Sequence, residues 1–123
     1  MSRVALVVDD DPVSRLVLCH MLKGRGWAVE QAADVPAAVT CLGQAPYDVV
    51  VCDFHLPSGT GLDVLAAADV AAAAPAFVLV TGMIEHPSLP EDLTVRWGAH
   101  LTKPVSSQAL DAALEQLFPA PTA

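Results

Sequence analysis

Three consecutive carboxylates, Asp9, Asp10 and Asp11, follow directly after the apolar run Val4–Val8. Two carboxylates about 4 Å apart repel each other by roughly 4 kcal/mol at an effective dielectric near 20, so folding alone does not call for such a cluster. At the end of a buried strand, this charge predicts either a bound cation or a raised pKa. Because carboxylate oxygens are preferred ligands of hard divalent cations, we expect a divalent metal site here.

Three further apolar runs end in polar residues whose chemistry suits the transfer of a phosphoryl group. These are Asp53 after residues 49–52, Thr81 after residues 77–80, and Lys103 after residues 99–102. They supply a nucleophilic carboxylate, a hydroxyl donor and a cation for phosphoryl oxygens. The ends of parallel strands meet at one edge of an α/β sheet, where such folds bind their ligands. The pattern therefore predicts one phosphoryl-transfer site.

Four motifs at these strand ends resemble the receiver domain of response regulators, the phosphoacceptor of two-component signalling, of the chemotaxis-regulator type. The resemblance extends from Arg3 to Leu117, and it is specific because four weak motifs occur in the family's order and spacing. The motifs are Val7-Val8-Asp9-Asp10-Asp11-Pro12, Asp53-Phe54-His55-Leu56-Pro57-Ser58-Gly59-Thr60-Gly61, Val80-Thr81-Gly82 and Lys103-Pro104.

The resemblance implies a phosphorylated aspartate and a metal site. Asp53 is the expected phosphoacceptor. Asp9, Asp10 and Asp53, with the backbone carbonyl of His55, are the expected ligands of Mg²⁺ or Mn²⁺. Of the first two aspartates, Asp10 is favoured as the direct ligand and Asp9 as one that acts through water.

The same resemblance implies roles around the phosphoryl group. Thr81 is expected to donate its hydroxyl and Lys103 to pair with the phosphoryl oxygens, with a Lys103-Pro104 bond that is often cis in the family. His100 stands where the family usually has a tyrosine or phenylalanine that changes rotamer on activation. We expect this imidazole to act with Thr81 as the switch, the alternative being a plain exposed strand residue.

The lifetime of the phosphoryl group on Asp53 is expected to depend on His55 and Met83, because these positions flank the path of the hydrolytic water in this family. Met83 offers an apolar, flexible thioether that cannot orient this water, which predicts slow self-dephosphorylation. If the ring of His55 holds this water itself, dephosphorylation becomes faster. The alternative is that His55 is a solvent-facing loop residue.

The expected function is that of a phosphoacceptor, which assists its own phosphorylation and dephosphorylation and is not otherwise an enzyme. The donor is a sensor histidine kinase or a histidine phosphotransfer protein, and a small phosphodonor can also serve. The signalling face comprises residues 89–97, 99–102 and 106–117, and it acts on a downstream protein or a covalently linked output domain. The last 20 residues contain no Lys or Arg and the fourth helix offers only Arg96, so we expect a monomer or weak dimer.

The fold expected from this pattern is α/β, with a flavodoxin-like five-stranded parallel sheet and helices on both faces. The order 2-1-3-4-5, implied by the resemblance, places the first and third strands side by side. Apolar runs predict strands at residues 4–8, 27–32, 49–53, 77–80 and 99–102. Helices are expected after the caps Asp11 (closed by Gly24 and Gly26), Asp34 (closed by Gly43) and Ser106, and at residues 62–73 and 89–97, the last ended by Gly98.

Composition is that of one domain. The 123 residues are enough for one core, and we expect a receiver domain at residues 1–118 followed by a Pro/Ala tail or the start of a linker at 119–123. The chain is expected to be either a stand-alone regulator or an amino-terminal receiver cut from an output domain. Three cysteines without CxxC spacing, Cys19, Cys41 and Cys52, predict core packing rather than a disulfide or zinc site.

Charge and hydropathy argue against other classes of partner. The net charge of −8 and the scattered basic residues disfavour direct nucleic-acid binding. No apolar run approaches the roughly 18 residues of a membrane span, and no signal peptide opens the chain, so we expect a cytoplasmic protein without a membrane partner.

Two other classes use a similar site or fold. A phosphatase of the haloacid-dehalogenase type shares the aspartate nucleophile, Mg²⁺, threonine and lysine, but needs a second acid where this chain has His55. A flavodoxin-type flavin carrier shares the sheet order, but needs a Ser/Thr/Gly-rich phosphate loop after the first strand. Turnover of small phosphomonoesters would indicate the phosphatase, and a yellow purified protein would indicate the flavin carrier.

Overall fold

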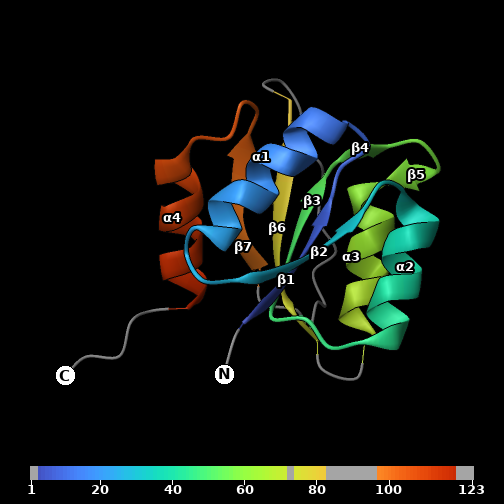
Figure 1. The fold of residues 1–123 in the computed structure, drawn as a ribbon. Coiled ribbons are helices and arrows are strands. Elements are labelled where there is room, and N and C mark those ends of the chain that lie inside the picture. Colours follow the sequence, from blue (N-terminus) through green and yellow to red (C-terminus); the bar gives the residue numbers. More distant parts are fainter. Residues whose placement is uncertain (1–2, 72–73, 83–96, 119–123) are drawn as a thin grey trace.

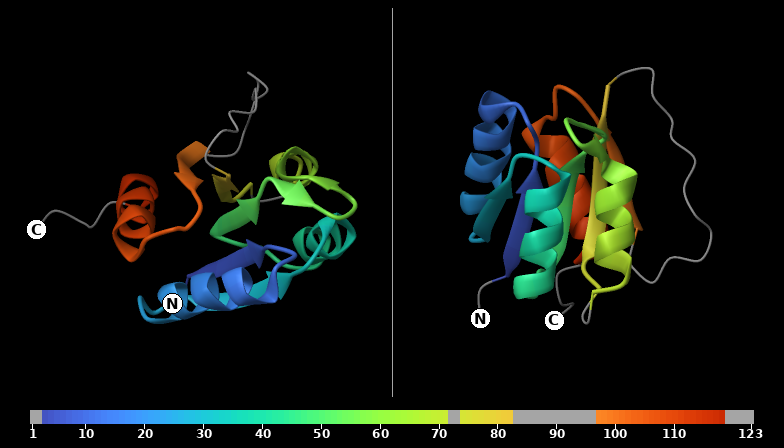
Figure 2. Two further views of the ribbon diagram at one scale, coloured as in Figure 1. Left: turned by 90° about the horizontal axis from the view of Figure 1, so that it is seen from above. Right: turned by 90° about the vertical axis from the view of Figure 1, so that its right-hand side faces the viewer.

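The computed structural model describes residues 3–71, 74–82 and 97–118, which form a parallel sheet between two helical layers (Figures 1 and 2). The sheet strands are β1 (Val4–Val8), β2 (Ala28–Ala32), β3 (Val49–Asp53), β6 (Ala76–Thr81) and β7 (Trp97–Thr102). A separate two-stranded ribbon consists of β4 (His55–Leu56) and β5 (Gly59–Thr60). The helices are α1 (Pro12–Lys23), α2 (Val35–Gln44), α3 (Gly61–Asp69) and α4 (Ser107–Leu117).

The order of the sheet is β2-β1-β3-β6-β7, and every neighbouring pair is parallel. Since β4 and β5 lie outside this sheet, the order corresponds to the predicted 2-1-3-4-5. The fold class expected from the sequence is therefore confirmed. In this order the carboxyl ends of β1 and β3 lie side by side.

Successive side chains of the buried strands point to opposite faces of the sheet, so they form two hydrophobic cores, one on each face. One core lies between the sheet and helices α1 and α4, where Val7, Val51 and Val80 pack with Leu18 and Leu110. The other lies under α2 and α3; it includes Leu6, Val50, Leu79, Leu42 and Leu65. Figure 2 shows the helices on the two faces of the sheet that cover these cores.

Side-chain caps set the starts of the helices as predicted. The Asp11 carboxylate accepts hydrogen bonds from the backbone of Val13 and Ser14, and Pro12 occupies the first helical position. Asp34 caps α2 through the backbone N–H of Ala37, and Ser106 likewise caps α4. Such side-chain acceptors satisfy N–H groups that the helix cannot pair internally.

Helix ends were predicted less well than helix starts. The first helix, α1, ends at its Gly24 cap as expected, but α2 continues through Gly43 to Gln44 and is capped by Ala45, whose backbone N–H donates to the carbonyl of Cys41. Helix α3 ends at Asp69 instead of residue 73. The next residue, Val70, is 82% exposed, so the helix has passed the sheet that stabilises it by burial.

The predicted helix end at Gly98 is wrong. Trp97 pairs with Phe77 of the neighbouring strand, so Trp97 and Gly98 belong to β7. Pairing along the edge of β6 thus overrides the usual preference of glycine for a helix end. Residues 89–96 of the predicted fourth helix lie outside the described part of the chain.

Two arginines join segments that are far apart in sequence. The Arg25 guanidinium pairs with Asp111 and donates to Ser107 of α4, and it also donates to the carbonyl of Met21 in α1. At the amino ends of the strands, the Arg3 guanidinium lies 4.7 Å from the ring centre of Phe118 and 5.8 Å from that of Trp27.

The cysteines agree with the expectation of core packing for the described residues. Cys19 and Cys52 are buried free thiols, and Cys41 is a half-buried free thiol. Burial raises the pKa of the Cys19 thiol and raises that of Cys52 well above its usual value. Among the described residues, no helix is long and apolar enough to cross a membrane.

Candidate functional site

The acidic site forms where β1 and β3 end side by side. Val8 pairs with Cys52, so Asp9 and Asp53 occupy equivalent positions at the carboxyl edge of the sheet. Asp9, Asp10 and Asp53 each offer an oxygen atom, and these three oxygens lie within 4.8 Å of one another. The convergence that the sheet order implied is therefore present.

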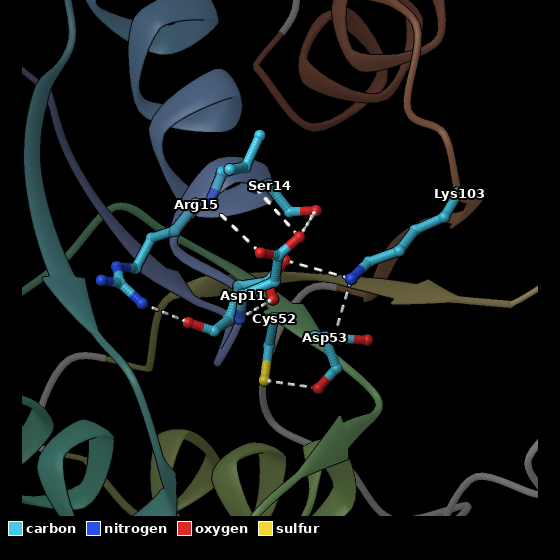
Figure 3. Close-up of polar contacts among 8 residues, drawn as sticks. Asp11, Ser14, Arg15, Cys52, Asp53 and Lys103 are labelled. Atoms are coloured by element: carbon cyan, nitrogen blue, oxygen red, sulfur yellow. Dashed lines mark hydrogen bonds and ion pairs between the residues drawn. The ribbon is translucent and has the colours of Figure 1, made fainter.

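The three consecutive aspartates have separate structural roles. Asp11 uses its carboxylate to cap α1 (Figure 3), and its hydrogen bond with the Ser14 hydroxyl lowers its pKa. Asp10 is exposed. Asp9 is fully buried, and its Oδ1 accepts a hydrogen bond of 2.9 Å from the backbone N–H of Asp11.

The second carboxylate oxygen of Asp9, Oδ2, lies 3.2 Å from Nζ of Lys103 but accepts no hydrogen bond from the described residues. A buried anionic oxygen without a hydrogen bond is costly. Together with Asp10 and Asp53, it gives an all-carboxylate donor set, which suits a hard cation such as Mg²⁺. The residues present therefore fit a divalent metal.

Lys103 connects the two strand ends from β7. Its Nζ donates to Oδ2 of Asp53 over 3.0 Å, and its backbone N–H donates to the carbonyl of Thr81. The peptide bond from Lys103 to Pro104 is cis. Burial alone lowers the pKa of Lys103, but its hydrogen bond and ion pair with Asp53 raise it overall.

The Asp53 carboxyl has a raised pKa for the opposite reason. Burial raises it, and the nearby charge of Asp9 adds to this effect, while the hydrogen bond and charge of Lys103 and the backbone N–H of His55 oppose it. Burial is the largest of these causes, and the ammonium of Lys103 offsets it only in part.

Arg15 supports the site from α1, and the sequence reasoning missed it. Its Nη1 donates to the carbonyl of Asp9 over 2.8 Å, and its Nε donates to Oε1 of Gln31 over 3.0 Å. The available signal was its position one helical turn after the Asp11 cap, which turns it back towards the acidic strand end.

Gly61 sets the packing beneath Asp53, and the sequence reasoning did not assign it this role. A Cβ at this position would lie 2.9 Å from the carbonyl oxygen of Asp53 and 2.7 Å from Cδ1 of Leu79. The backbone N–H of Gly61 also donates to the carbonyl of Phe54. Only glycine allows this close approach, which holds the chain after Asp53 against the start of α3.

The structure places Thr81, His100 and His55 at or near this edge. Thr81 ends β6 beside β3 and is buried, and its Oγ1 lies 2.6 Å from Nε2 of His100. His55 is exposed on β4, and its ring packs edge-on against that of Phe54 with centroids 5.1 Å apart. Met83 lies outside the described residues.

A hollow of about 340 Å³ adjoins the acidic cluster. Its polar wall contains Asp9 and Lys103, and its apolar wall includes Val13 and Val17 of α1. These two valines are 67% and 46% exposed, and Leu16 beside them is 60% exposed. Helix α1 thus presents an exposed apolar patch, formed by Val13, Leu16 and Val17, next to Asp9.

Comparison with known protein families identifies the kind of domain. The model of the response regulator receiver domain matches residues 5–115. The chain belongs to this family. Receiver domains are the phosphoacceptors of two-component signalling, and the predicted resemblance is therefore confirmed.

Individual relatives agree with this assignment. Chemotaxis protein CheY of Pseudomonas aeruginosa is 27% identical over 116 residues, which cover 92% of this chain and 94% of that protein. The probable transcriptional regulatory protein TcrX of Mycobacterium tuberculosis is 42% identical over 60 residues, which cover 49% of this chain and 26% of TcrX. The matched receiver segment is thus about a quarter of TcrX but nearly all of CheY.

Solved structures share the fold. Chemotaxis response regulator CheY4 of Vibrio cholerae matches with a TM-score of 0.80 and 25% identity, covering 96% of this chain and 100% of that one. The receiver domain of sensor histidine kinase PA1611 of P. aeruginosa, solved with magnesium in its active site cleft, matches with a TM-score of 0.79 and 22% identity over 98% of this receiver and 100% of that chain.

Proposed function

We propose that this receiver accepts a phosphoryl group on Asp53 from a phosphohistidine of a sensor histidine kinase or a histidine phosphotransfer protein. The observation that carries the proposal is the position of the Asp53 carboxylate. It stands at the end of a central strand, within 4.8 Å of the oxygens of two other carboxylates and 3.0 Å from an ammonium group. Membership of the receiver family supports the same role.

We assign a metal to the same cluster. Asp9, Asp10 and Asp53, with the backbone carbonyl of His55, would hold Mg²⁺ or Mn²⁺. Bound there, the cation would neutralise the carboxylates and the phosphoryl oxygens. The buried Oδ2 of Asp9, which accepts no hydrogen bond from the described residues, and the all-carboxylate donor set support this assignment.

In the transfer, an oxygen of the Asp53 carboxylate attacks phosphorus. The P–N bond of the phosphohistidine breaks, the electron pair returns to the imidazole, and an O–P bond forms on Asp53. Lys103 moves its ammonium from the carboxylates to the phosphoryl oxygens, and Thr81 donates its hydroxyl to them. Because this is positioning and charge stabilisation, the receiver promotes its own phosphorylation without acting on other substrates.

The apolar patch of Val13, Leu16 and Val17 is the proposed kinase-docking surface. It is exposed and borders the hollow that reaches Asp9 and Lys103. A donor helix seated on it would bring a phosphohistidine towards Asp53.

The proposed output surface is the face formed by residues 89–97, β7 and α4, acting on a downstream protein or a linked output domain. Phosphorylation adds about 1.5 to 2 negative charges and would shift an existing equilibrium of this face. We propose residues 1–118 as the receiver domain and residues 119–123 as a tail or the start of a linker.

Intact-mass analysis tests the proposed function. With acetyl phosphate and Mg²⁺, the chain should gain one phosphoryl group, and Asp53→Asn should gain none. Asp111→Asn, which changes a surface aspartate of α4, is the matched control and should label normally. Labelling of Asp53→Asn, or labelling that survives removal of Mg²⁺ by a chelator, would contradict the assignment.

A turnover assay with small phosphomonoesters separates this function from the phosphatase alternative. The receiver should release no more phosphate than its Asp53→Asn variant. Continuous release that depends on Asp53 would instead indicate a phosphatase.

A further inference from the structure

The guanidinium of Arg15 connects the acidic strand end to the edge of the sheet. Arg15 extends from the start of α1 (Figure 3) and is half-buried. Its Nη1 donates to the backbone carbonyl of Asp9 over 2.8 Å, and its Nε donates to Oε1 of Gln31 on β2 over 3.0 Å. Since β2 is an edge strand, this one side chain joins α1, the end of β1 and the edge of the sheet.

These contacts fix the peptide unit between Asp9 and Asp10. The N–H of Asp9 donates to the carbonyl of Ala32 on β2 over 3.1 Å, while the carbonyl of Asp9 accepts from Arg15. The carbonyl of Asp9 and the N–H of Asp10 belong to the same planar unit. A fixed carbonyl therefore also fixes the direction in which the backbone of Asp10 leaves the strand.

Asp10 is the one of the three proposed carboxylate ligands that burial does not hold in place. Asp9 is fully buried and Asp53 is 8% exposed, whereas Asp10 is exposed. Ordering an exposed side chain around a metal costs conformational entropy. A backbone that already keeps Asp10 within reach of the other two carboxylates lowers this cost.

We propose that Arg15, held by Gln31, is a positioning residue for the metal ligand Asp10. The inference rests on the proposed metal site at Asp9, Asp10 and Asp53. Arg15 is not itself a ligand, and it acts through the peptide unit that leads into Asp10. Groups that orient a metal ligand in this way typically change metal affinity by about 10-fold to 100-fold.

The positive charge of Arg15 predicts an effect of the opposite sign. A guanidinium beside a cation site repels the cation, so its removal would strengthen Mg²⁺ binding if charge alone mattered. If Arg15 positions Asp10, its removal weakens Mg²⁺ binding in spite of this repulsion. The sign of the change in affinity therefore separates positioning from charge.

The first test is a calorimetric Mg²⁺ titration of the folded chains. Arg15→Met should bind Mg²⁺ about tenfold more weakly than the parent. In the metal-free chain, ¹⁵N relaxation should show a lower backbone order parameter at Asp10 in this variant. Lys23→Met is the matched control, because it removes one positive charge from an exposed position of α1, and it should change neither quantity.

The second test uses Gln31, which carries no charge. Gln31→Leu removes the acceptor of Nε at an exposed position and should weaken Mg²⁺ binding about threefold. Gln31→Glu keeps an acceptor for Arg15 and should bind Mg²⁺ at least as tightly as the parent. In an Arg15→Met background, Gln31→Leu should have no further effect. Gln108→Leu makes the same substitution at an exposed glutamine of α4 and should leave the affinity unchanged.

Equal or tighter Mg²⁺ binding by Arg15→Met would overturn the inference, as would an unchanged order parameter at Asp10. It would also be overturned by a Gln31→Leu effect that persists in the Arg15→Met background, or by Gln31→Glu binding as weakly as Gln31→Leu. If Arg15→Met does not fold, Gln31→Leu decides, and an affinity equal to that of the parent overturns the inference.

The proposed function has a separate outcome. In each of the cases above the parent still binds Mg²⁺ and is still labelled at Asp53, so the proposed function stands. A parent that binds no Mg²⁺ and takes up no phosphoryl group overturns the proposed function and this inference with it.

Discussion

Lys103 and Asp53 lie 50 residues apart in the sequence and form an ion pair with 3.0 Å between Nζ and Oδ2. The same ammonium lies 3.2 Å from Oδ2 of Asp9. The ammonium thus lies beside both buried carboxylates of the proposed metal site. We predict that Lys103 and a cation bound there compete for these carboxylates.

Removal of this competitor should have opposite effects on metal binding and on phosphorylation. We expect Lys103→Met to bind Mg²⁺ about threefold to tenfold more tightly, because a charge-assisted contact no longer has to be broken. Labelling by acetyl phosphate should slow by at least about tenfold, since the cation that pairs with the phosphoryl oxygens is lost. Calorimetric Mg²⁺ titration and intact-mass kinetics measure the two effects.

Lys23→Met is the control for this comparison, because Lys23 is an exposed lysine of α1 outside the site. It should change neither quantity. Weaker Mg²⁺ binding by Lys103→Met would show that the lysine organises the carboxylates instead of competing for them.

The neighbours Asp10 and Asp11 should separate metal binding from folding. Asp10→Ala should lower Mg²⁺ affinity by at least about tenfold with little loss of thermal stability. Asp11→Ala should lower the melting temperature, because it removes the cap of α1, and should leave Mg²⁺ affinity nearly unchanged. If Asp11→Ala loses the metal and keeps its stability, the two roles have been assigned to the wrong residues.

The raised pKa of Asp53 predicts that its neutral variant is more stable at neutral pH. A carboxyl with a raised pKa in the folded chain stabilises the fold below its unfolded value, near 3.9 for aspartate, and this contribution is lost as pH rises through the folded pKa. Asp53→Asn should therefore have a higher free energy of unfolding than the parent at pH 7 without metal. The difference should shrink as pH falls towards 4.

Asp111 should show the opposite dependence, because its hydrogen bond with Arg25 lowers its pKa. Its contribution is present above the ordinary aspartate value and is lost as pH falls through the lowered pKa. Asp111→Asn should thus be less stable than the parent at pH 7, with the difference fading in acid. Urea unfolding at several pH values would show whether the two variants diverge in this way.

Gly61 and Gly43 should respond in opposite ways to alanine. Gly61→Ala places a Cβ against the Asp53 carbonyl and Leu79 and should destabilise the chain by about 1–3 kcal/mol. Gly43→Ala adds a methyl group in open space within α2 and should stabilise it by about 0.5–1 kcal/mol. Denaturant titration measures both, and a neutral Gly61→Ala would mean that β3 and α3 are less tightly packed than described.

The apolar patch of α1 should matter to a protein donor but not to a small one. Leu16→Glu should slow phosphotransfer from a histidine kinase core that labels the parent by about tenfold or more, because it places a charge in an apolar contact. Labelling by acetyl phosphate should be unchanged. Val70→Glu, at another exposed valine, is the control, and equal slowing by both variants would place docking elsewhere.

Local chemistry explains which features were predictable from sequence. Asp11, Asp34 and Ser106 cap helices within a few residues of themselves, so the pattern was enough. The convergence of Asp9 with Asp53 followed once the strand order was known. The start of β7 at Trp97 could not be predicted because it depends on pairing with Phe77, which lies 20 positions earlier in the chain.

Side-chain contacts between elements were the least predictable part of the site. The hydrogen bond from Arg15 to the Asp9 carbonyl depends on the rotamer of a long side chain. The contact between Thr81 and His100 depends on the register of two strands that are not joined by a tight turn. Sequence spacing alone determines neither.

The cluster of Arg3, Trp27 and Phe118 lies at the amino ends of the strands, whereas Asp53 lies at their carboxyl ends. The strand β1 separates these ends by five residues, or about 16 Å. That span is roughly twice the Debye length of about 8 Å at physiological ionic strength. Through solvent, a binding partner at the Phe118 end would therefore sense the charge added by the proposed phosphorylation of Asp53 only weakly. We expect it to respond instead to a change in the shape or stiffness of the sheet between the two ends.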